Sequence, residues 1–494
     1  MSGENGSSRQ ALIRYVNRQQ MSWRATDVEK LVAEDHPVRA VWELVGGLDL
    51  RQFYEAIESN VEGGGRPAFD PQLLIRLWVY AYSQGIGSAR EVARRCEFDP
   101  AFQWLAGLQE VNYHTLADFR VNRGKELDEL FTQVLAALSK ERLITLEQVM
   151  QDGTKIKALA STRTYQQEES IREHLRRAQQ RVAELGDPLQ EETGPRVRQA
   201  RERARRERQQ RLENTLEELR KLQASRSGEK AKSKARASTS DPQARVMKQS
   251  DGGLALSYNA QISADAAQGL IVSAVVTQDA NDTAQLLPAV DRLEERLGKK
   301  PKQMVADGGY TTRENIEKIA GRGVDFLGSL DKTASGATAP QRLPPNVFVY
   351  EPGSNRYLCP EGKWLRPQGR HPHKKKGGLT AHRYEAKFSD CQSCLRKPEC
   401  CPENQSQGRG LLRWQESAVV TAFREKMATR EAQAQYRRRG RVVEFCHAWI
   451  KSKLGLRQFH VRGLAKAGTE LLWACFTYNL QQWIRLRRAI TQGA

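Results

Sequence analysis

The feature that most constrains this chain is a highly charged stretch over residues 166–236, which carries too few apolar side chains to form part of a globular core. Apolar residues recur in it at heptad spacing at Ile171, Leu175, Ala178, Val182 and Leu185, and again at Leu212, Leu216 and Leu219. Such a seam is typical of paired helices. We therefore predict a coiled helical insertion with a basic linker over 166–240, and a solvated charged insertion is the alternative.

The sequence on either side of this insertion alternates between strand and helix patterns. Predicted strands cover 145–152, 255–265, 270–278, 302–307 and 324–330, and predicted helices cover 282–298 and 313–320. Asp282 is the expected N-cap of the first of these helices. This order of elements predicts an α/β sheet that is interrupted after its first strand.

Residues 1–140 instead show short helices that are joined by tight turns. Asp70-Pro71, Ser88 and Asp99-Pro100 are typical helix starts, and Gly85-Ile86-Gly87 separates two of the helices. The pattern suits a DNA-binding module of the helix-turn-helix kind, and a plain helical bundle is the alternative.

The charge balance points to a polyanionic partner. Among 494 residues, 79 are Lys or Arg and 59 are Asp or Glu, which gives a net charge of +20. No apolar run reaches the roughly 18 residues that a membrane-spanning helix needs, so we expect no membrane partner. Nucleic acid is then the leading candidate partner.

Two aspartates are predicted where strands end. Asp152 lies in Gln151-Asp-Gly-Thr-Lys155 and Asp307 in Ala306-Asp-Gly-Gly-Tyr310. The carboxyl ends of strands are common places for functional groups in α/β folds. Each aspartate alone is equally typical of a turn cap.

Glu444 is the third carboxylate of interest. It is the only acidic residue from Ala432 to Thr469, and eight Lys or Arg residues lie between Arg437 and Arg462. Lys451, seven residues after Glu444, shares its helix face. A lone carboxylate among phosphate-binding cations suggests a metal ligand beside a DNA backbone, and a salt bridge to nearby arginines is the alternative. Three carboxylates from separate segments suit two Mg²⁺ or Mn²⁺ ions roughly 3.5–4 Å apart, as phosphoryl transfer requires.

The combined stretches resemble the insertion-sequence DDE transposases, which have an RNase H-like catalytic domain. The matching segments are residues 152–158, 257–265, 306–310 and 436–451, continuing through 462–464 to 478–480. Residues 35–125 are similar to the helical N-terminal domain of such transposases. The resemblance implies an all-α N-terminal DNA-binding domain (1–140) and an RNase H-like mixed-sheet core (141–165, 241–334). It also implies a Cys-containing insertion (335–415) and C-terminal helices of the core (416–494).

The family's Tyr-Arg-Glu-Lys signature implies roles for individual residues. Tyr436, Arg439, Glu444 and Lys451 match it in order. The interval between Arg439 and Glu444 is one residue longer than the commonest spacing, so Arg441 is an alternative to Arg439. The resemblance makes Asp152, Asp307 and Glu444 the catalytic Mg²⁺ ligands, and it assigns DNA contacts to Tyr436, Arg439, Arg441, Lys451, Lys155 and Lys157.

The implied activity is metal-dependent cleavage at the ends of a mobile element, followed by attack of the freed 3′-hydroxyl on target DNA. The implied partners are the terminal inverted repeats, target duplex DNA and a second copy of the chain. The implied place of action is the bacterial cytoplasm, at the nucleoid. A metal-dependent nuclease or resolvase is the enzyme alternative, and a non-catalytic DNA-binding regulator is the other.

A cluster of cysteines forms a separate candidate site. Cys391 and Cys394 are a close pair, Cys400 and Cys401 follow, and Cys359 lies upstream. Four thiolates, most simply Cys359, Cys391, Cys394 and Cys400, could bind a structural Zn²⁺. Reduced, unliganded thiols are the alternative. Cys96, Cys446 and Cys475 lie in apolar helical contexts and are expected in the core.

Overall fold

The computed structural model describes residues 19, 21, 25–57, 67–184, 195–330, 342–372, 380–401, 407–414 and 417–493. The expected domain boundaries near 334 and 415, and Leu185 of the heptad seam, lie outside these residues. Within the described part, no helix combines the length and the apolar character that crossing a membrane requires.

Short capped helices form the N-terminal part of the chain. They are η1 (Val28–Leu31), α1 (Pro37–Gly46), α2 (Arg51–Glu55), α3 (Pro71–Ser83), α4 (Ala89–Phe98), α5 (Pro100–Ala106), α6 (Tyr113–Asn122) and α7 (Gly124–Lys140). The side chains of Asp70, Ser88 and Asp99 accept backbone N–H groups at the starts of α3, α4 and α5. The sequence therefore located these three helix starts correctly.

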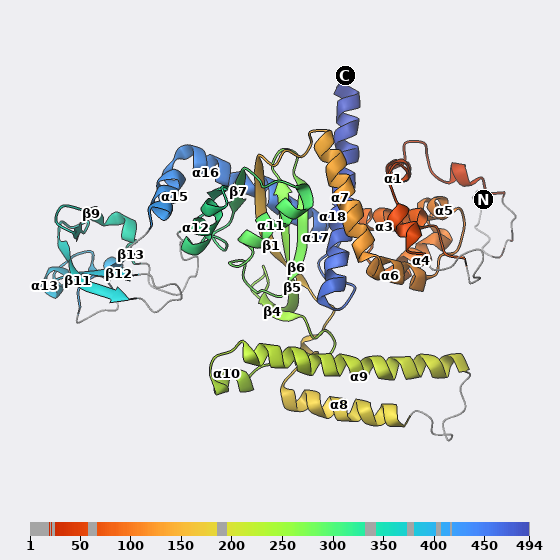
Figure 1. Ribbon diagram of the computed structural model, residues 1–494, viewed down its shortest axis with the longest axis horizontal. Coiled ribbons are helices and arrows are strands. Elements are labelled where there is room, and N and C mark those ends of the chain that lie inside the picture. Colours follow the sequence, from red (N-terminus) through yellow and green to blue (C-terminus); the bar gives the residue numbers. More distant parts are fainter. Residues whose placement is uncertain are drawn as a thin grey trace, which may run out of the picture.

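A mixed sheet forms the centre of the molecule (Figure 1). Its strands are β1 (Gln148–Lys157), β4 (Arg245–Lys248), β5 (Leu254–Asp265), β6 (Leu270–Thr277), β7 (Gln303–Ala306) and β8 (Asp325–Leu327). Strand β1 lies between β5, which is antiparallel to it, and β7, which is parallel, while β8 extends the parallel edge. Strands β4 and β6 both pair with β5 in antiparallel fashion.

Strand β1 is longer than the sequence predicts. The prediction ended the strand at Asp152, whereas β1 continues to Lys157 because Gly153 to Lys157 pair with Gln261 to Ser257 of β5. Asp152 is therefore in the middle of a strand. The pairing of β7 with β1 ends at Ala306 and Gln151, one residue before Asp152, so the side of β1 that faces β7 is open at Asp152.

The C-terminal half supplies helices that pack on this sheet and on the N-terminal helices. They are α11 (Leu286–Leu297), α12 (Arg313–Gly321), α15 (Ala418–Ala428), α16 (Arg430–Arg437), α17 (Arg439–Ser452) and α18 (Leu464–Gly493). Asn479 of α18 exchanges two hydrogen bonds with the backbone of Ile271 in β6. Trp473 of the same helix donates to the carbonyl of Arg120 in α6. One continuous apolar core consequently includes the N-terminal helices, α18 and the sheet.

Two further groups of elements extend away from the sheet (Figure 1). One consists of β2 (Tyr165–Gln166), α8 (Glu168–Ala183), α9 (Pro195–Ala224), α10 (Glu229–Ser233) and β3 (Ala237–Ser238). Helices α8 and α9 lie side by side (Figure 1), and Ile171, Leu216 and Leu219 are buried in a small core of their own. The second group consists of β9 (Val349–Glu351), β10 (Arg356–Leu358), β11 (Trp364–Pro372), β12 (Thr380–Ala386), α13 (Phe388–Gln392), α14 (Lys397–Cys400) and β13 (Gly410–Trp414).

Candidate active site

Asp152 is the central carboxylate of the candidate site. Its side chain is 16% exposed, and its Oδ2 atom lies 3.4 Å from Nη1 of Arg439. Burial raises the pKa of Asp152 to about 7, and the charges of Asp307 and Glu444 also raise it, while Arg439 opposes them. A carboxyl group so perturbed among charged neighbours is typical of functional sites.

Helix α17 provides the groups that face Asp152. Arg439 at its first turn also lies 3.0 Å from Oε1 of Glu444, so one guanidinium contacts two carboxylates from different elements. Lys451, two turns after Glu444, donates a hydrogen bond of 2.6 Å to the Thr154 hydroxyl on β1. Arg439 and Lys451 of α17 therefore both contact residues of β1.

Asp307 follows the last residue of β7. The parallel register pairs Gln151 with Ala306, which places Asp307 next to Asp152 along the sheet. Its Oδ1 atom accepts the N–H of Gly309 at 2.7 Å, so the turn after β7 orients the carboxylate. The charges of Asp307 and of Glu444 both act on the carboxyl of Asp152.

The other predicted DNA-contact residues occupy different positions around this site. Tyr436, at the end of α16, has its ring centroid 5.8 Å from the guanidinium carbon of Arg439. Lys155 pairs with Asp282 at 3.4 Å. Arg441 and Lys157 are exposed. Arg439, the first of the two alternatives, is therefore the arginine that contacts the carboxylates.

Asp282 belongs to this region, although the sequence suggested only a helix cap for it. Helix α11 begins at Leu286, and the Oδ1 atom of Asp282 instead accepts hydrogen bonds from Asn259 at 2.7 Å and Gln261 at 2.6 Å. The available signal was the run Ser257, Asn259, Gln261 and Ser263, where polar residues alternate along a buried strand. Buried polar side chains at every second position predict a hydrogen-bonded layer on one face of the sheet.

His447, one turn after Glu444, is expected from the sequence to pack or to face phosphate and not to bind metal, and it too lies beside Asp152. Its ring is buried, and Nε2 lies 3.8 Å from Oδ2 of Asp152. Neither ring nitrogen has a hydrogen-bond partner among the described residues. Burial and the charge of Lys451 lower the pKa of His447 to about 3, so the ring is neutral at physiological pH.

Carboxylate oxygens, the groups that Asp152, Asp307 and Glu444 carry, are the ligands that hard divalent cations prefer. Ionised Asp152 is disfavoured by burial and by the neighbouring carboxylates, and added positive charge would relieve this repulsion. In the described part of the chain, however, no group of three or more His, Cys, Asp or Glu side chains is close enough together to hold a metal ion. Arg439 is the positive charge that lies between Asp152 and Glu444 in this structure.

The cysteine cluster forms a second, separate site. Cys359, Cys391, Cys394, Cys400 and Cys401 line one small pocket. The sulfur of Cys359 accepts the N–H of Lys363 at 3.2 Å, and that of Cys391 accepts the N–H of Arg409 at 3.4 Å. The other three cysteines, Cys96, Cys446 and Cys475, are buried, as expected.

Comparison with known proteins gives two matches to protein families. Residues 358–484 match a Transposase DDE domain, and residues 26–122 match a Transposase domain (DUF772). No curated protein and no solved structure matches the chain. The two matches support an insertion-sequence transposase of the DDE type, and a DDE domain implies an RNase H-like fold. Arg439, Glu444 and Lys451 lie inside the first match, whereas Asp152 and Asp307 lie outside both.

Proposed function

We propose that this chain is a transposase that cleaves DNA at the ends of its insertion sequence and transfers the freed 3′-ends into target DNA. The observation that carries the proposal is the double contact of Arg439 with Asp152 and Glu444, next to Asp307. Asp152 and Glu444 share one arginine, and Asp307 follows β7, the strand that lies beside β1. Such a combination would supply both metal ligands and a phosphate-binding group.

We assign the residues the following roles. Asp152, Asp307 and Glu444 would hold two Mg²⁺ or Mn²⁺ ions, which when bound activate the attacking oxygen and stabilise the leaving oxygen. Arg439 binds the non-bridging oxygens of the scissile phosphate, and the ring of Tyr436 limits where its guanidinium can lie. Lys451 carries a second positive charge at Thr154, where it binds the adjacent phosphate.

The contacts of Arg439 would change when DNA binds at the site. Without DNA, the single guanidinium of Arg439 pairs with both Asp152 and Glu444. The side chain of Glu444 is 51% exposed, so it is free to move when Arg439 turns to a phosphate. Neutral His447 adds no positive charge beside Asp152. We further propose that two copies act together on the two element ends.

A cleavage assay on the chain's own flanking DNA tests this function. Purified protein is incubated with Mg²⁺ and a plasmid that carries the reading frame with its flanks, and nicks are mapped. We expect nicks at short inverted repeats, no cleavage by Asp307→Asn or Glu444→Gln, and full cleavage by Glu425→Gln on the exposed face of α15. DNA binding by the two inactive variants should persist.

A joining assay separates the proposal from its alternatives. Duplexes that end in a repeat with a free 3′-hydroxyl are mixed with supercoiled target plasmid. Joined products support a transposase, whereas cleavage without joining would indicate a nuclease or resolvase. Binding without either reaction would indicate a regulator and would refute the proposed chemistry.

We also propose that the cysteine cluster binds a structural Zn²⁺. Cys359, Cys391, Cys394 and Cys400 remain the proposed ligands, and buried Cys401 in the same pocket is an alternative to Cys400. The N–H groups that already point at two sulfurs would stabilise thiolates. Because the described thiols are not gathered at coordinating distance, binding would require side-chain rotation.

Elemental analysis of the purified chain tests the zinc proposal. We expect about one zinc per chain, loss of that zinc in Cys394→Ser, and retention in Cys96→Ala, since Cys96 is buried in α4. Protein that is folded and active without stoichiometric zinc would refute the proposal.

A further inference from the structure

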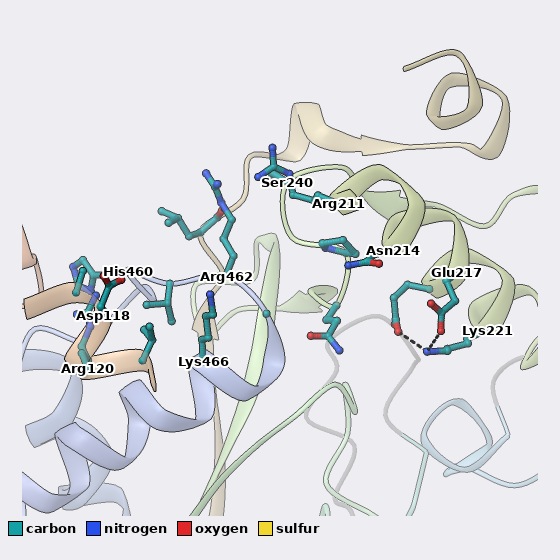
Figure 2. Close-up of a pocket in the computed structure, with 18 residues that line it drawn as sticks. Asp118, Arg120, Arg211, Asn214, Glu217, Lys221, Ser240, His460, Arg462 and Lys466 are labelled. Atoms are coloured by element: carbon teal, nitrogen blue, oxygen red, sulfur yellow. Dashed lines mark hydrogen bonds and ion pairs between the residues drawn. The ribbon is translucent and has the colours of Figure 1, made fainter. Parts of the chain in front are cut away.

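A large cleft separates α9 from the body of the molecule. It encloses about 810 Å³ between α9, the end of α6 and the segment that leads into α18 (Figure 2). Arg211 and Asn214 of α9 line one wall, and His460, Arg462 and Lys466 line the other. The cleft is distinct from the site around Asp152, because none of the three candidate carboxylates lines it.

The cations in this cleft lack a matching set of carboxylates. The Nε atom of Arg211 is buried and has no hydrogen-bond partner among the described residues. Burial lowers the pKa of Arg211, and the nearby positive charges of Arg462 and Arg208 lower it further. The Nε atom of Arg462 donates to the carbonyl of Leu159 at 3.3 Å. Like charges that converge with unused donors indicate a place for an anion.

Most carboxylates of the cleft are already paired. Glu217 and Glu218 contact Lys221 at 2.9 and 3.1 Å, and Figure 2 shows this group away from Arg462. Glu218 also pairs with Arg245 at 2.6 Å. Asp118, the remaining acidic residue of the lining, lies with His460 at the end of the cleft away from Arg211 (Figure 2).

Basic residues continue from the cleft in two directions. Along α9, arginines precede Arg211 at 198, 201, 203, 205, 206 and 208, with Glu202 and Glu207 between them. Toward the sheet, Phe459 and Lys157 are joined by a backbone hydrogen bond, and Arg462 reaches Leu159. Strand β1 covers about 17 Å from Asp152 to Lys157, and the bend that follows adds a few ångströms, so Leu159 lies about 20 Å along the chain from Asp152. That length equals about six base pairs of duplex DNA at 3.4 Å each.

We infer that the cleft between α9 and the 460–466 segment binds the phosphate backbone of duplex DNA about six base pairs from the phosphate at Asp152. Arg211 and Arg462 contact neighbouring phosphates, and α9 follows the strand beyond them. The distance to the cleaved phosphate rests on the proposed function, whereas duplex binding by the cleft does not. The helical insertion would thereby act as a clamp on DNA.

A charge-matched pair of variants tests the cleft. Arg211→Ala/Arg462→Ala removes two cleft cations. Lys299→Ala/Lys302→Ala removes two lysines next to the start of β7, at the opposite end of the strand from Asp307. Binding of a random-sequence duplex of about 40 base pairs is measured by fluorescence anisotropy over a salt series. Thermal unfolding of both variants shows whether they are folded. DNA binding by Arg211→Lys/Arg462→Lys, which keeps both positive charges, shows whether a loss of affinity is due to the loss of charge.

We expect the cleft variant to bind DNA at least about 10-fold more weakly in low salt, with a salt slope reduced by about 1.8, because two phosphate contacts are lost. The control variant Lys299→Ala/Lys302→Ala and the charge-retaining variant Arg211→Lys/Arg462→Lys should both bind DNA nearly as tightly as the parent does. A cleft variant that is folded and binds with unchanged affinity and slope would overturn the inference. A changed oligomeric state with unchanged DNA binding would also overturn it and would assign the cleft to a second copy.

The outcomes also separate this inference from the proposed function. Parent protein that binds duplex through the cleft and never cleaves element ends would refute the function alone. Cleavage of element ends by a cleft variant with undiminished DNA affinity would refute the cleft alone. Hydroxyl-radical footprints that lose protection about six base pairs from the nick would support the predicted position.

Discussion

Replacing Asp152 by asparagine should abolish cleavage and, in the absence of divalent cations, make the folded protein more stable. The buried carboxyl is held near Asp307 and Glu444, and burial with these charges raises its pKa to about 7 from an ordinary 3.8. Asparagine keeps the shape of the side chain and removes the charge. The ion pair with Arg439 is already included in the net effect.

The size of the effect follows from the same pKa. A raised carboxyl pKa means that folding favours the protonated form, so stability is present below pH 4 and is lost as pH rises through 7. The difference between a pKa of about 7 in the folded protein and 3.8 in the unfolded chain corresponds to about 4 kcal/mol. Because the structure around the ionised carboxylate relaxes, we expect the measured loss of stability to lie between about 2 and 4 kcal/mol. The Asp152→Asn variant has no such loss. Its free energy of unfolding should therefore exceed that of the parent by an amount that grows from pH 4 to pH 7 and stays constant at higher pH.

Urea unfolding with a divalent-cation chelator, repeated from pH 5 to pH 8, measures this advantage. Mg²⁺ should then stabilise the parent and leave the variant unchanged, since a cation that binds only the native state raises stability. A variant that is folded yet no more stable than the parent at pH 8 would refute the reasoning about repulsion at the site.

Three other substitutions test neighbouring parts of the structure. Gly153→Ala should lower the free energy of unfolding by about 1–3 kcal/mol, because a Cβ atom there would overlap the carboxylate of Asp282; urea unfolding measures it. Glu470→Gln should lower it by about 3–5 kcal/mol, since it leaves the charge of buried Arg120, 3.5 Å away, without its partner; a calorimetric melt compares the two proteins. Lys451→Met should slow cleavage of a pre-bound element end about 100-fold in single-turnover assays. The same variant should unfold at an equal or higher urea concentration, because burial lowers the pKa of Lys451 and disfavours its charge.

Local signals in the sequence were sufficient for much of the fold. Capping side chains and apolar spacing located the starts of α3, α4 and α5, since these depend on neighbouring residues only. The ends of strands were harder to predict from the sequence. Gly153 looks like a strand terminator, yet β1 continues through it because β5 offers a partner for every residue to Lys157. Pairing between distant strands overrides local propensity there.

The candidate site shows the same division. Charge patterns and the resemblance to transposases singled out Asp152, Asp307, Glu444 and Lys451 as candidates. In the structure Arg439 contacts Asp152 and Glu444, Asp307 follows the strand beside β1, and Lys451 bonds to Thr154 on β1. Asp282 was missed because its partners lie on β5, more than twenty residues away in the chain. The choice between Arg439 and Arg441 also needed the structure, since only the rotation of α17 against β1 selects the arginine that reaches both carboxylates.

The sequence by itself determined what kinds of groups this protein carries: a large positive charge, isolated carboxylates, clustered cysteines and a charged helical insertion. The tertiary structure alone decided which of these groups meet. The composition and spacing of residues in a sequence inform only about structure within a few residues. Repulsion among carboxylates and the formation of a cleft beside α9 depend instead on distances between segments that lie hundreds of residues apart in the chain. Those distances are fixed only when the sheet and its covering helices have packed.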